Sequence, residues 1–259
     1  VVRFWRVAAP GAIRGRPAAT GTDTIVGTAS GRVLCLSVET GRQRWSTDLP
    51  GAIEGAIATA PGRTFVGYAG GVAALDGNGK VAWTCPTPDR VTSTIAVFND
   101  LVLFGCRDGV IRALSPSNGA LLWQVPTAGF VEGGVSSNGT SFFAGSADGS
   151  LYAIGLDGTL RWRFAPPDEL VDEIKSTPLA IGDMVVVGNA AGHLFALSTL
   201  DGAERWRRRL PGGVKTSTPA LHGQDIVIGD ESGTVHRMRL IDGSPLWTTN
   251  LADPIRSEV

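Results

Sequence analysis

Polar and charged side chains recur along the chain at intervals of about 40 residues, and together they could bind a small polar or anionic ligand. They occupy equivalent positions in short strand-like runs: Arg14, Glu54, Thr92, Glu132, Lys175, Thr216 and Arg256. Arg16 lies two positions after Arg14 and would face the same way, because strand side chains alternate. If the runs converge, two outcomes are open. The charges can pair with one another, or they can form a ligand or partner site.

Other residue types capable of chemistry are scattered. The histidines, His193, His222 and His236, fall in different parts of the repeat, so we expect no shared metal site. The cysteines are odd in number and lack CxxC spacing, which argues against both a disulfide framework and a zinc site. We expect Cys35, Cys85 and Cys106 to be unpaired, inert thiols, with a redox or nucleophilic role as the alternative.

One acidic cluster stands in the stretch PPDELVDEIKS, with carboxylates at Asp168, Glu169, Asp172 and Glu173. Its spacing lacks the central glycine of a calcium loop, so we expect a solvated acidic loop, with a partner contact as the alternative. The sequence contains no G-x-S-x-G, P-loop or H-E-x-x-H pattern. We therefore predict no catalytic residues and no metal ligands.

Composition narrows the class of partner. The 259 residues are 43% hydrophobic and 18% charged, and the formal net charge is -1 without long runs of one sign. This balance indicates neither a nucleic-acid footprint nor a membrane-surface patch. No apolar run approaches the roughly 18 residues of a membrane span, so we expect no membrane insertion in this segment.

The tryptophans indicate which structural elements would position these residues. They recur every 38 to 44 residues, at Trp5, Trp45, Trp83, Trp123, Trp162, Trp206 and Trp247. A period of about 40 residues is typical of repeat architectures. Within each period, short partly β-branched runs alternate with turn dipeptides such as Asp-Gly and Asn-Gly. Four strands per period, joined as an antiparallel meander, fit this pattern.

The sequence therefore predicts an all-β fold, a β-propeller of four-stranded antiparallel blades with six full repeats and a partial seventh. Each sheet would be covered by its neighbours, and its first, innermost strand would carry the polar residues described above. We expect the seven tryptophans to be structural docking groups that cover the junctions between blades. Their N–H groups would donate to backbone carbonyls there.

The repeat unit A-L-(D/S)-x-x-(T/D/N)-G-x-x-x-W resembles the tryptophan-docking motif of the quinoprotein-like propellers, also called pyrroloquinoline quinone repeats. Its best instances run from Cys35 to Trp45, from Ala113 to Trp123 and from Ala196 to Trp206. The second and fourth units are one residue shorter before the turn glycine, and the sixth has Arg237-Met238 in place of Ala-Leu. The resemblance covers nearly the whole chain.

This family has two branches, and the resemblance implies different functions for them. The quinone-dependent dehydrogenases carry a calcium-bound quinone in a pocket walled by long loops and, in the alcohol enzymes, an adjacent cysteine pair. Neither long loops nor adjacent cysteines occur here. The other branch consists of bacterial binding scaffolds, such as the lipoprotein of the outer-membrane barrel-assembly machinery, and of propeller domains in signalling proteins.

We therefore predict a non-catalytic binding or sensing module for a protein partner or a small polar ligand, without a cofactor. A quinone-dependent dehydrogenase and a structural spacer are the alternatives. The compartment stays open, because the resemblance favours an extracytoplasmic site and the unpaired cysteines favour the cytoplasm.

Residues 1–259 are expected to form a single domain within a longer chain. Both ends of the sequence fall in the same phase of the repeat, and Val1 stands where a methionine would begin a complete chain. We expect the strand around Trp5 to form the outer edge of a seventh blade, whose middle strands would need at least about 20 further residues.

Overall fold

The computed structural model describes residues 5–55, 57–98 and 100–255. Within these ranges the chain is built from β-strands, with one short 3₁₀-helix, η1 (Asp168–Leu170). It forms two compact units that meet in the sequence between Gln124 and Val125. No described helix has the length and apolar character needed to cross a membrane.

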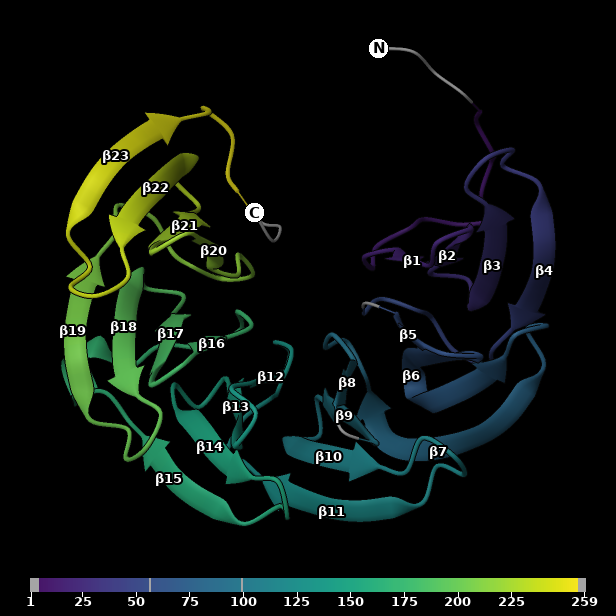
Figure 1. Ribbon diagram of the computed structural model, residues 1–259, viewed down its shortest axis with the longest axis horizontal. Coiled ribbons are helices and arrows are strands. Elements are labelled where there is room, and N and C mark those ends of the chain that lie inside the picture. The colour runs from purple at the N-terminus through teal and green to yellow at the C-terminus, as the bar shows by residue number, and fades with distance from the viewer. Residues whose placement is uncertain (1–4, 56, 99, 256–259) are drawn as a thin grey trace. The chain divides into compact units, whose positions relative to one another are not determined.

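The first unit contains three antiparallel sheets in chain order (Figure 1). The strands of its first sheet follow one another as β1 (Ala18–Ala19), β2 (Asp23–Gly27), β3 (Arg32–Ser37) and β4 (Gln43–Asp48). Its third sheet has the same order, with β8 (Ala96–Phe98), β9 (Leu101–Gly105), β10 (Val110–Leu114) and β11 (Leu121–Pro126). Each strand pairs with its neighbour in the sequence, which is the predicted meander.

The second sheet of this unit contains β5 (Ala58–Ala60), β6 (Arg63–Asp76) and β7 (Val81–Arg90). The sequence predicts separate strands over 64–69 and 71–76, whereas β6 runs through both. Its first residues pair with β5, and Ala69 and the residues from Gly71 to Leu75 pair with β7. Gly70, with a φ of 112°, stands between the two halves. β6 thus occupies both middle positions of the sheet.

The second unit also contains three sheets, each a four-stranded meander (Figure 1). The first consists of β12 (Ser136–Ser137), β13 (Ser141–Gly145), β14 (Leu151–Gly155) and β15 (Leu160–Phe164). The next consists of β16 (Leu179–Ile181), β17 (Met184–Gly188), β18 (His193–Ser198) and β19 (Glu204–Arg209). The last consists of β20 (Ala220–His222), β21 (Asp225–Gly229), β22 (Thr234–Arg239) and β23 (Pro245–Asn250).

The tryptophan motif has a local cause in these sheets. Trp45 pairs across the ladder with Cys35, and Trp206 pairs with Ala196, so a small residue lies opposite the indole. The register shifts directly after each pair, which marks a β-bulge. The turn that precedes the outer strand contains a glycine with positive φ, as predicted, for example 69° at Gly41.

The middle strands supply most of the core. All five residues of β14 and of β17 are buried, so both faces of these sheets are covered. The outer strands are much more exposed, and every residue of β23 is exposed. Burial on both faces of the middle strands is what stacking of neighbouring sheets requires.

Consecutive sheets within a unit are joined by a repeated contact. The N–H of Ile53 donates to the carbonyl of Thr28 at 3.1 Å, and Val214 donates to Asn189 at 2.9 Å. The β-branched side chain then fills the space over a glycine at the end of the second strand. A Cβ added to Gly27 would lie 2.3 Å from Cγ2 of Ile53. Glycine is therefore required at this close approach.

The innermost strands are shorter than predicted. They contain two or three residues each, and all the described candidate polar residues lie before them, in segments without regular structure. The prediction that these side chains belong to the strands is wrong. The segments that carry these side chains hydrogen-bond to the turn of the neighbouring sheet, as Ile53 does to Thr28, and not to a strand of their own sheet.

The predicted strand around Trp5 is also absent from the described residues, since positions 5–9 form no strand. A strand requires a paired neighbour to satisfy its backbone groups, and no described strand pairs with this segment. The expectation of one domain over 1–259 stays a prediction.

Candidate functional site

Glu54 stands between two arginines in the first unit. Arg14 Nη1 lies 2.7 Å from its Oε1, and Arg90 Nη1 lies 3.2 Å from its Oε2. The carboxylate is largely covered, with 18% of its side chain exposed, whereas Arg14 is 62% exposed. The cluster therefore has a partly buried acidic centre and two arginines that still face solvent. Guanidinium groups with donors left over can bind a carboxylate or phosphate from outside.

Small residues next to these side chains let the segments approach each other. A Cβ on Gly15 would lie 2.0 Å from the carbonyl oxygen of Gly55, and a Cβ on Gly55 would lie 2.6 Å from that of Ser93. Ser93 itself is buried, and its hydroxyl bonds both to the carbonyl and to the N–H of Gly105, at 2.9 and 3.0 Å. These close backbone approaches determine where the side chains of the Glu54 cluster lie.

Lys175 is the centre of a similar cluster in the second unit. Its Nζ lies 2.7 Å from Oε2 of Glu173 and 3.6 Å from Oε2 of Glu132. The nearer carboxylate, Glu173, raises the pKa of Lys175 by hydrogen bonding, so this ammonium is charged. A Cβ on Gly133 would lie 2.6 Å from the carbonyl oxygen of Ser176, so the two segments meet as Gly55 and Ser93 do.

The remaining candidates are placed as follows. Arg16 and Thr216 are exposed, and each takes part in an interaction of its own. The hydroxyl oxygen of Thr92 is buried and makes no hydrogen bond. Arg256 lies outside the described residues. Ion pairing is therefore observed for Arg14 with Glu54 and for Lys175 with Glu132, while the ligand or partner role stays a prediction.

Sequence reasoning did not place Arg90 or Glu173 in these clusters, although it named Glu173 as part of the acidic stretch, and it passed over a further ion pair of Lys215. Arg90 and Glu173 each lie two positions before an aligned candidate, Thr92 and Lys175. Lys215 pairs with Glu231 at 2.8 Å, directly beside Thr216. Side chains two positions apart on an extended segment lie on the same face. A search two positions before each candidate, as well as two positions after it, would have found Arg90 and Glu173.

Four of the tryptophans contact the following sheet in a recurring way: Trp5, Trp83, Trp162 and Trp206. The Trp206 N–H donates to the carbonyl of Leu240 at 2.9 Å, and its ring covers Gly243. Trp5 does the same with Val38, at 2.7 Å, and Gly41. The corresponding N–H bonds of Trp83 and Trp162 are to Pro116 and Thr199. Their contribution to stability stays a prediction.

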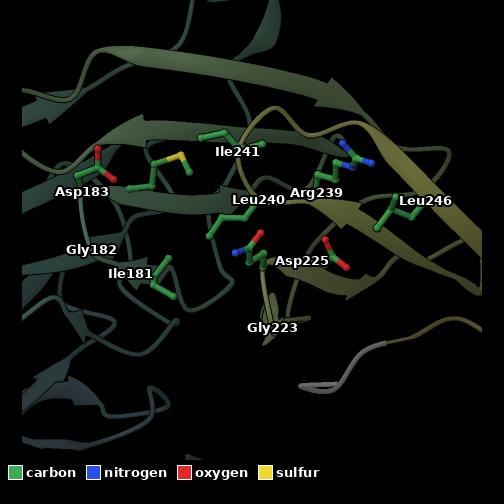
Figure 2. Close-up of a pocket in the computed structure, with 11 residues that line it drawn as sticks. Ile181, Gly182, Asp183, Gly223, Asp225, Arg239, Leu240, Ile241 and Leu246 are labelled. Atoms are coloured by element: carbon green, nitrogen blue, oxygen red, sulfur yellow. The ribbon is translucent and has the colours of Figure 1, made fainter.

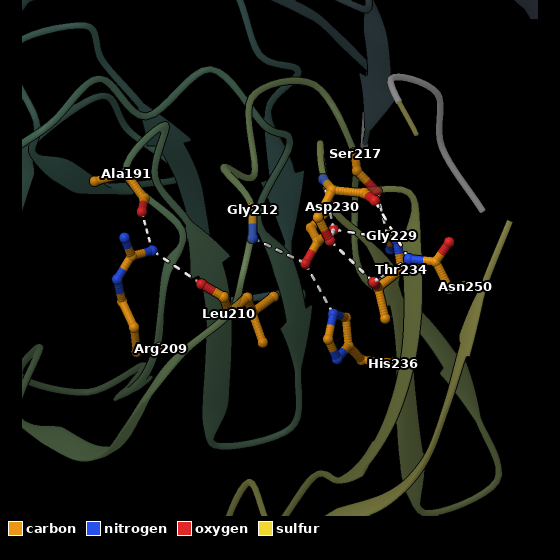
Figure 3. A network of polar contacts seen from close by, with 11 residues as sticks. Ala191, Arg209, Leu210, Gly212, Ser217, Gly229, Asp230, Thr234, His236 and Asn250 are labelled. Carbon is orange, nitrogen blue, oxygen red and sulfur yellow. Dashed lines mark hydrogen bonds and ion pairs between the residues drawn. The ribbon is translucent and has the colours of Figure 1, made fainter. Parts of the chain in front are cut away.

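A buried acidic group that sequence reasoning passed over lies in the last sheet. Asp230 is fully buried and accepts hydrogen bonds from Ser232, from the ring of His236 and from the N–H of Gly212 (Figure 3). The N–H of Thr234 also donates to it. The carboxylate is thus saturated with protein donors, and it ties the segment before β20 to the turn after β21.

The three cysteines and the acidic stretch show no such convergence. Cys35, Cys85 and Cys106 are free thiols, and burial raises the pKa of each. Among residues 5–55, 57–98 and 100–255, no three histidine, cysteine or acidic side chains stand close enough to hold a metal ion. The acidic stretch contains η1, which begins at Asp168, and none of the helix residues is buried.

Comparison with known proteins gives a family match over nearly the whole chain. The family model PQQ_2, described as "Outer membrane protein assembly factor BamB", matches residues 3–130 and 107–259. The assembly factor BamB of Yersinia pestis is 26% identical over 221 residues, which are 75% of this chain and 56% of that protein. BamB of Legionella pneumophila is 25% identical over 193 residues, 74% of this chain and 42% of that protein. The chain thus spans about half the length of these relatives.

A solved structure shows the same fold. The crystal structure of BamB from Moraxella catarrhalis superposes with a TM-score of 0.86 at 21% sequence identity, covering 98% of this chain and 81% of that one. The predicted all-β propeller architecture is confirmed by this likeness. The likeness itself concerns the fold alone.

Proposed function

The chain belongs to the PQQ_2 family, described as outer membrane protein assembly factor BamB, and we propose that it binds a protein partner during outer membrane protein assembly. The relatives that it matches are named as assembly factors and not as enzymes, in agreement with the prediction of a non-catalytic propeller. Family membership over almost the full chain is the observation that carries this proposal.

We propose two partner contacts, the Glu54 cluster in the first unit and the Lys175 cluster in the second. Arg14 and Arg90 keep half or more of their side chains in solvent while they hold Glu54. A partner carboxylate could share these guanidinium groups while they remain paired with Glu54. Arginine is enriched among the residues that dominate protein interfaces, because it combines several donors with an apolar stem.

Copurification tests the proposal. The tagged chain is incubated with a membrane extract of the source bacterium, and bound proteins are identified by mass spectrometry. We expect enrichment of proteins of outer membrane assembly, and we expect the double variant Arg14→Glu, Arg90→Glu to retain less than a tenth of them. Recovery of no such protein would reject the function.

A matched control separates a specific surface from general charge. Arg32 pairs with Asp48 at 2.6 Å, and its side chain is 42% exposed, so Arg32→Glu changes a comparable arginine on β3. This variant should bind the partner normally. Equal loss in both variants would mean that the Glu54 cluster is not the partner surface.

The two alternatives from the sequence give different results. A quinone-dependent enzyme would bind pyrroloquinoline quinone with calcium, detected as a shift in quinone absorbance on titration with the chain. A structural spacer would bind neither the quinone nor a partner.

A further inference from the structure

A groove lies between the last two sheets of the second unit, at the ends of the inner strands that point away from Lys175 and Thr216. It has a volume of about 1,020 Å³. One side comes from the turn between β16 and β17, with Ile181 and Asp183 (Figure 2). The other side comes from the last sheet, with Asp225, Arg239 and neighbouring apolar residues (Figure 2).

The groove is open because one bridging side chain is missing. Between the first two sheets of this unit, the side-chain amide of Asn138 donates to the carbonyl of Gly182 at 3.2 Å and ties the two turns together. Asn138 bonds to Ser141, the first residue of β13. In the next sheet, Ile181 pairs with Met184, the first residue of β17, so Ile181 occupies the position equivalent to Asn138. Isoleucine has no donor with which to reach the turn at Gly223.

Apolar side chains line the groove and remain in contact with water. Ile241 is 69% exposed and Leu246 is 42% exposed, and Leu240 is half-buried. Buried Met184 also lines the groove. A contiguous exposed apolar surface with a polar rim is typical of a binding site.

The charges of the groove are unequally satisfied. Asp183 pairs with Arg205 at 2.6 Å, and Asp225 receives two hydrogen bonds from Arg237, at 2.9 and 2.6 Å. Both carboxylates are therefore neutralised by the protein. The guanidinium of Arg239, in contrast, forms no ion pair with the described part of the chain. Its spare donors favour a negative group on whatever fills the groove.

The carboxylate of Asp242 on the same turn attracts Arg239 only at a longer range than an ion pair. The Asp242 side chain accepts the N–H of Ser244 at 2.8 Å, and hydrogen bonds with Ser244 hold its pKa below the usual range. It forms no ion pair with Arg239 among the described residues. The groove thus presents an apolar surface with one unpaired positive charge.

We propose that this groove binds an extended peptide segment in which apolar side chains flank a carboxylate. Pockets for small molecules enclose most of their ligand, whereas the exposure of Ile241 and Leu246 leaves this groove open along its length. An open groove suits an extended peptide, because successive side chains of the peptide can contact the groove along its length. The proposal rests on the protein-binding function proposed above and adds a second contact, away from the Lys175 cluster.

Two labelled peptides test the proposal by fluorescence anisotropy. One has the sequence Gly-Ser-Leu-Glu-Leu-Ser-Gly, and the other has lysine in place of the glutamate. We expect the acidic peptide to bind at least tenfold more tightly. Arg239→Glu should reverse the preference, because it exchanges the sign of the unpaired charge, and Ile241→Ser should weaken both peptides at least fivefold.

Two control variants match these changes outside the groove. Arg42 is an exposed arginine next to the equivalent turn of the first sheet, and Leu200, 84% exposed, is an apolar side chain that does not line the groove. Arg42→Glu and Leu200→Ser should leave both affinities unchanged. Thermal melting of each variant confirms that it is folded.

The outcomes separate the two proposals. Equal affinity for the two peptides, or equal effects of Arg42→Glu and Arg239→Glu, would overturn the groove proposal. If the partner copurifies but the peptides do not bind, the groove proposal alone fails. If the peptides bind with the expected preference but no partner copurifies, the groove stands and the proposed function fails.

Discussion

His236 Nε2 lies 2.9 Å from Oδ2 of Asp230, and both side chains are buried at the turn between β21 and β22 (Figure 3). The N–H of Gly212, which precedes β20, donates to the same carboxylate oxygen at 3.2 Å. The pair therefore joins the segment that enters the last sheet to the middle of that sheet. A buried carboxylate in such a position is stabilising only while its hydrogen bonds are complete.

Asp230 should make stability depend on acid pH. Burial raises its pKa, but hydrogen bonds from Ser232, His236 and nearby backbone N–H groups outweigh burial and hold the pKa below the usual range. A lowered carboxylate pKa stabilises the fold above the unfolded value of about 3.9, and this stabilisation is lost as the pH falls through the folded value. We expect Asp230→Asn to lower the free energy of unfolding by about 1–3 kcal/mol at neutral pH.

Urea denaturation at several pH values measures this effect. The difference between Asp230→Asn and the natural chain should shrink as the pH falls below about 4, where the carboxyl of the unfolded chain takes up a proton, and should be smallest below the lowered pKa of the folded carboxyl. Asp183→Asn, at a site whose side chain is 76% exposed, serves as the control and should change little. A constant difference from pH 3 to pH 7 would contradict the assigned role of the charge.

Two tryptophans at equivalent positions should differ in their contribution to stability. Trp206 is 6% exposed and covers Gly243, whereas Trp247 is 43% exposed. We expect Trp206→Ala to cost about 3–5 kcal/mol of unfolding free energy, the usual cost of removing a large buried ring. Trp247→Ala in the same chain should cost about 1 kcal/mol or less. Similar losses in denaturant titrations of the two variants would show that docking on the next sheet does not stabilise this fold.

The sheets could be predicted from sequence because the signals that specify them are local. Cys35 and Ala196 lie opposite a tryptophan, and a small residue there leaves space for the indole. Gly41 supplies a positive φ at a turn. The glycine turn recurs in every repeat, and the small residue recurs in most of them, with Arg237 opposite Trp247 as an exception. Because each feature depends on residues within about ten positions, it identifies the strands locally.

The candidate site depends on contacts that the repeat does not specify. Arg90 reaches Glu54 from the end of β7, and Glu173 reaches Lys175 from the acidic stretch, where the longest interval between tryptophans falls. Strand alternation also placed the candidates on strands, although the segments that carry them bond to the preceding sheet's turn, as Ile53 does. These hydrogen bonds recur from sheet to sheet, but they join residues of different sheets, so the alternation of side chains within one strand does not indicate them.

The three cysteines should differ in their reactivity. Burial raises the pKa of Cys35, Cys85 and Cys106, which keeps them protonated at neutral pH, and the thiolate is the reactive form. Cys85 is the only one of these three that is not fully buried. We expect N-ethylmaleimide to label Cys85 at least tenfold faster than the other two in the folded chain, followed by mass spectrometry. Equal rates at all three, without denaturant, would mean that the folded chain does not protect Cys35 and Cys106.

Gly41 and Gly62 share a φ of 69° and differ in what surrounds them. A Cβ on Gly41 would lie 2.7 Å from the ring of Trp5, whereas nothing lies within 4 Å of a Cβ on Gly62. Both alanine substitutions should therefore cost about 1–2 kcal/mol for the left-handed backbone. Gly41→Ala should cost about 1–3 kcal/mol more, because the methyl group displaces the indole. In a Trp5→Ala background, urea denaturation should give equal losses for the two glycine variants, since the ring that creates the difference is gone. A difference that persists without the ring would trace the extra cost to the turn itself and not to the tryptophan.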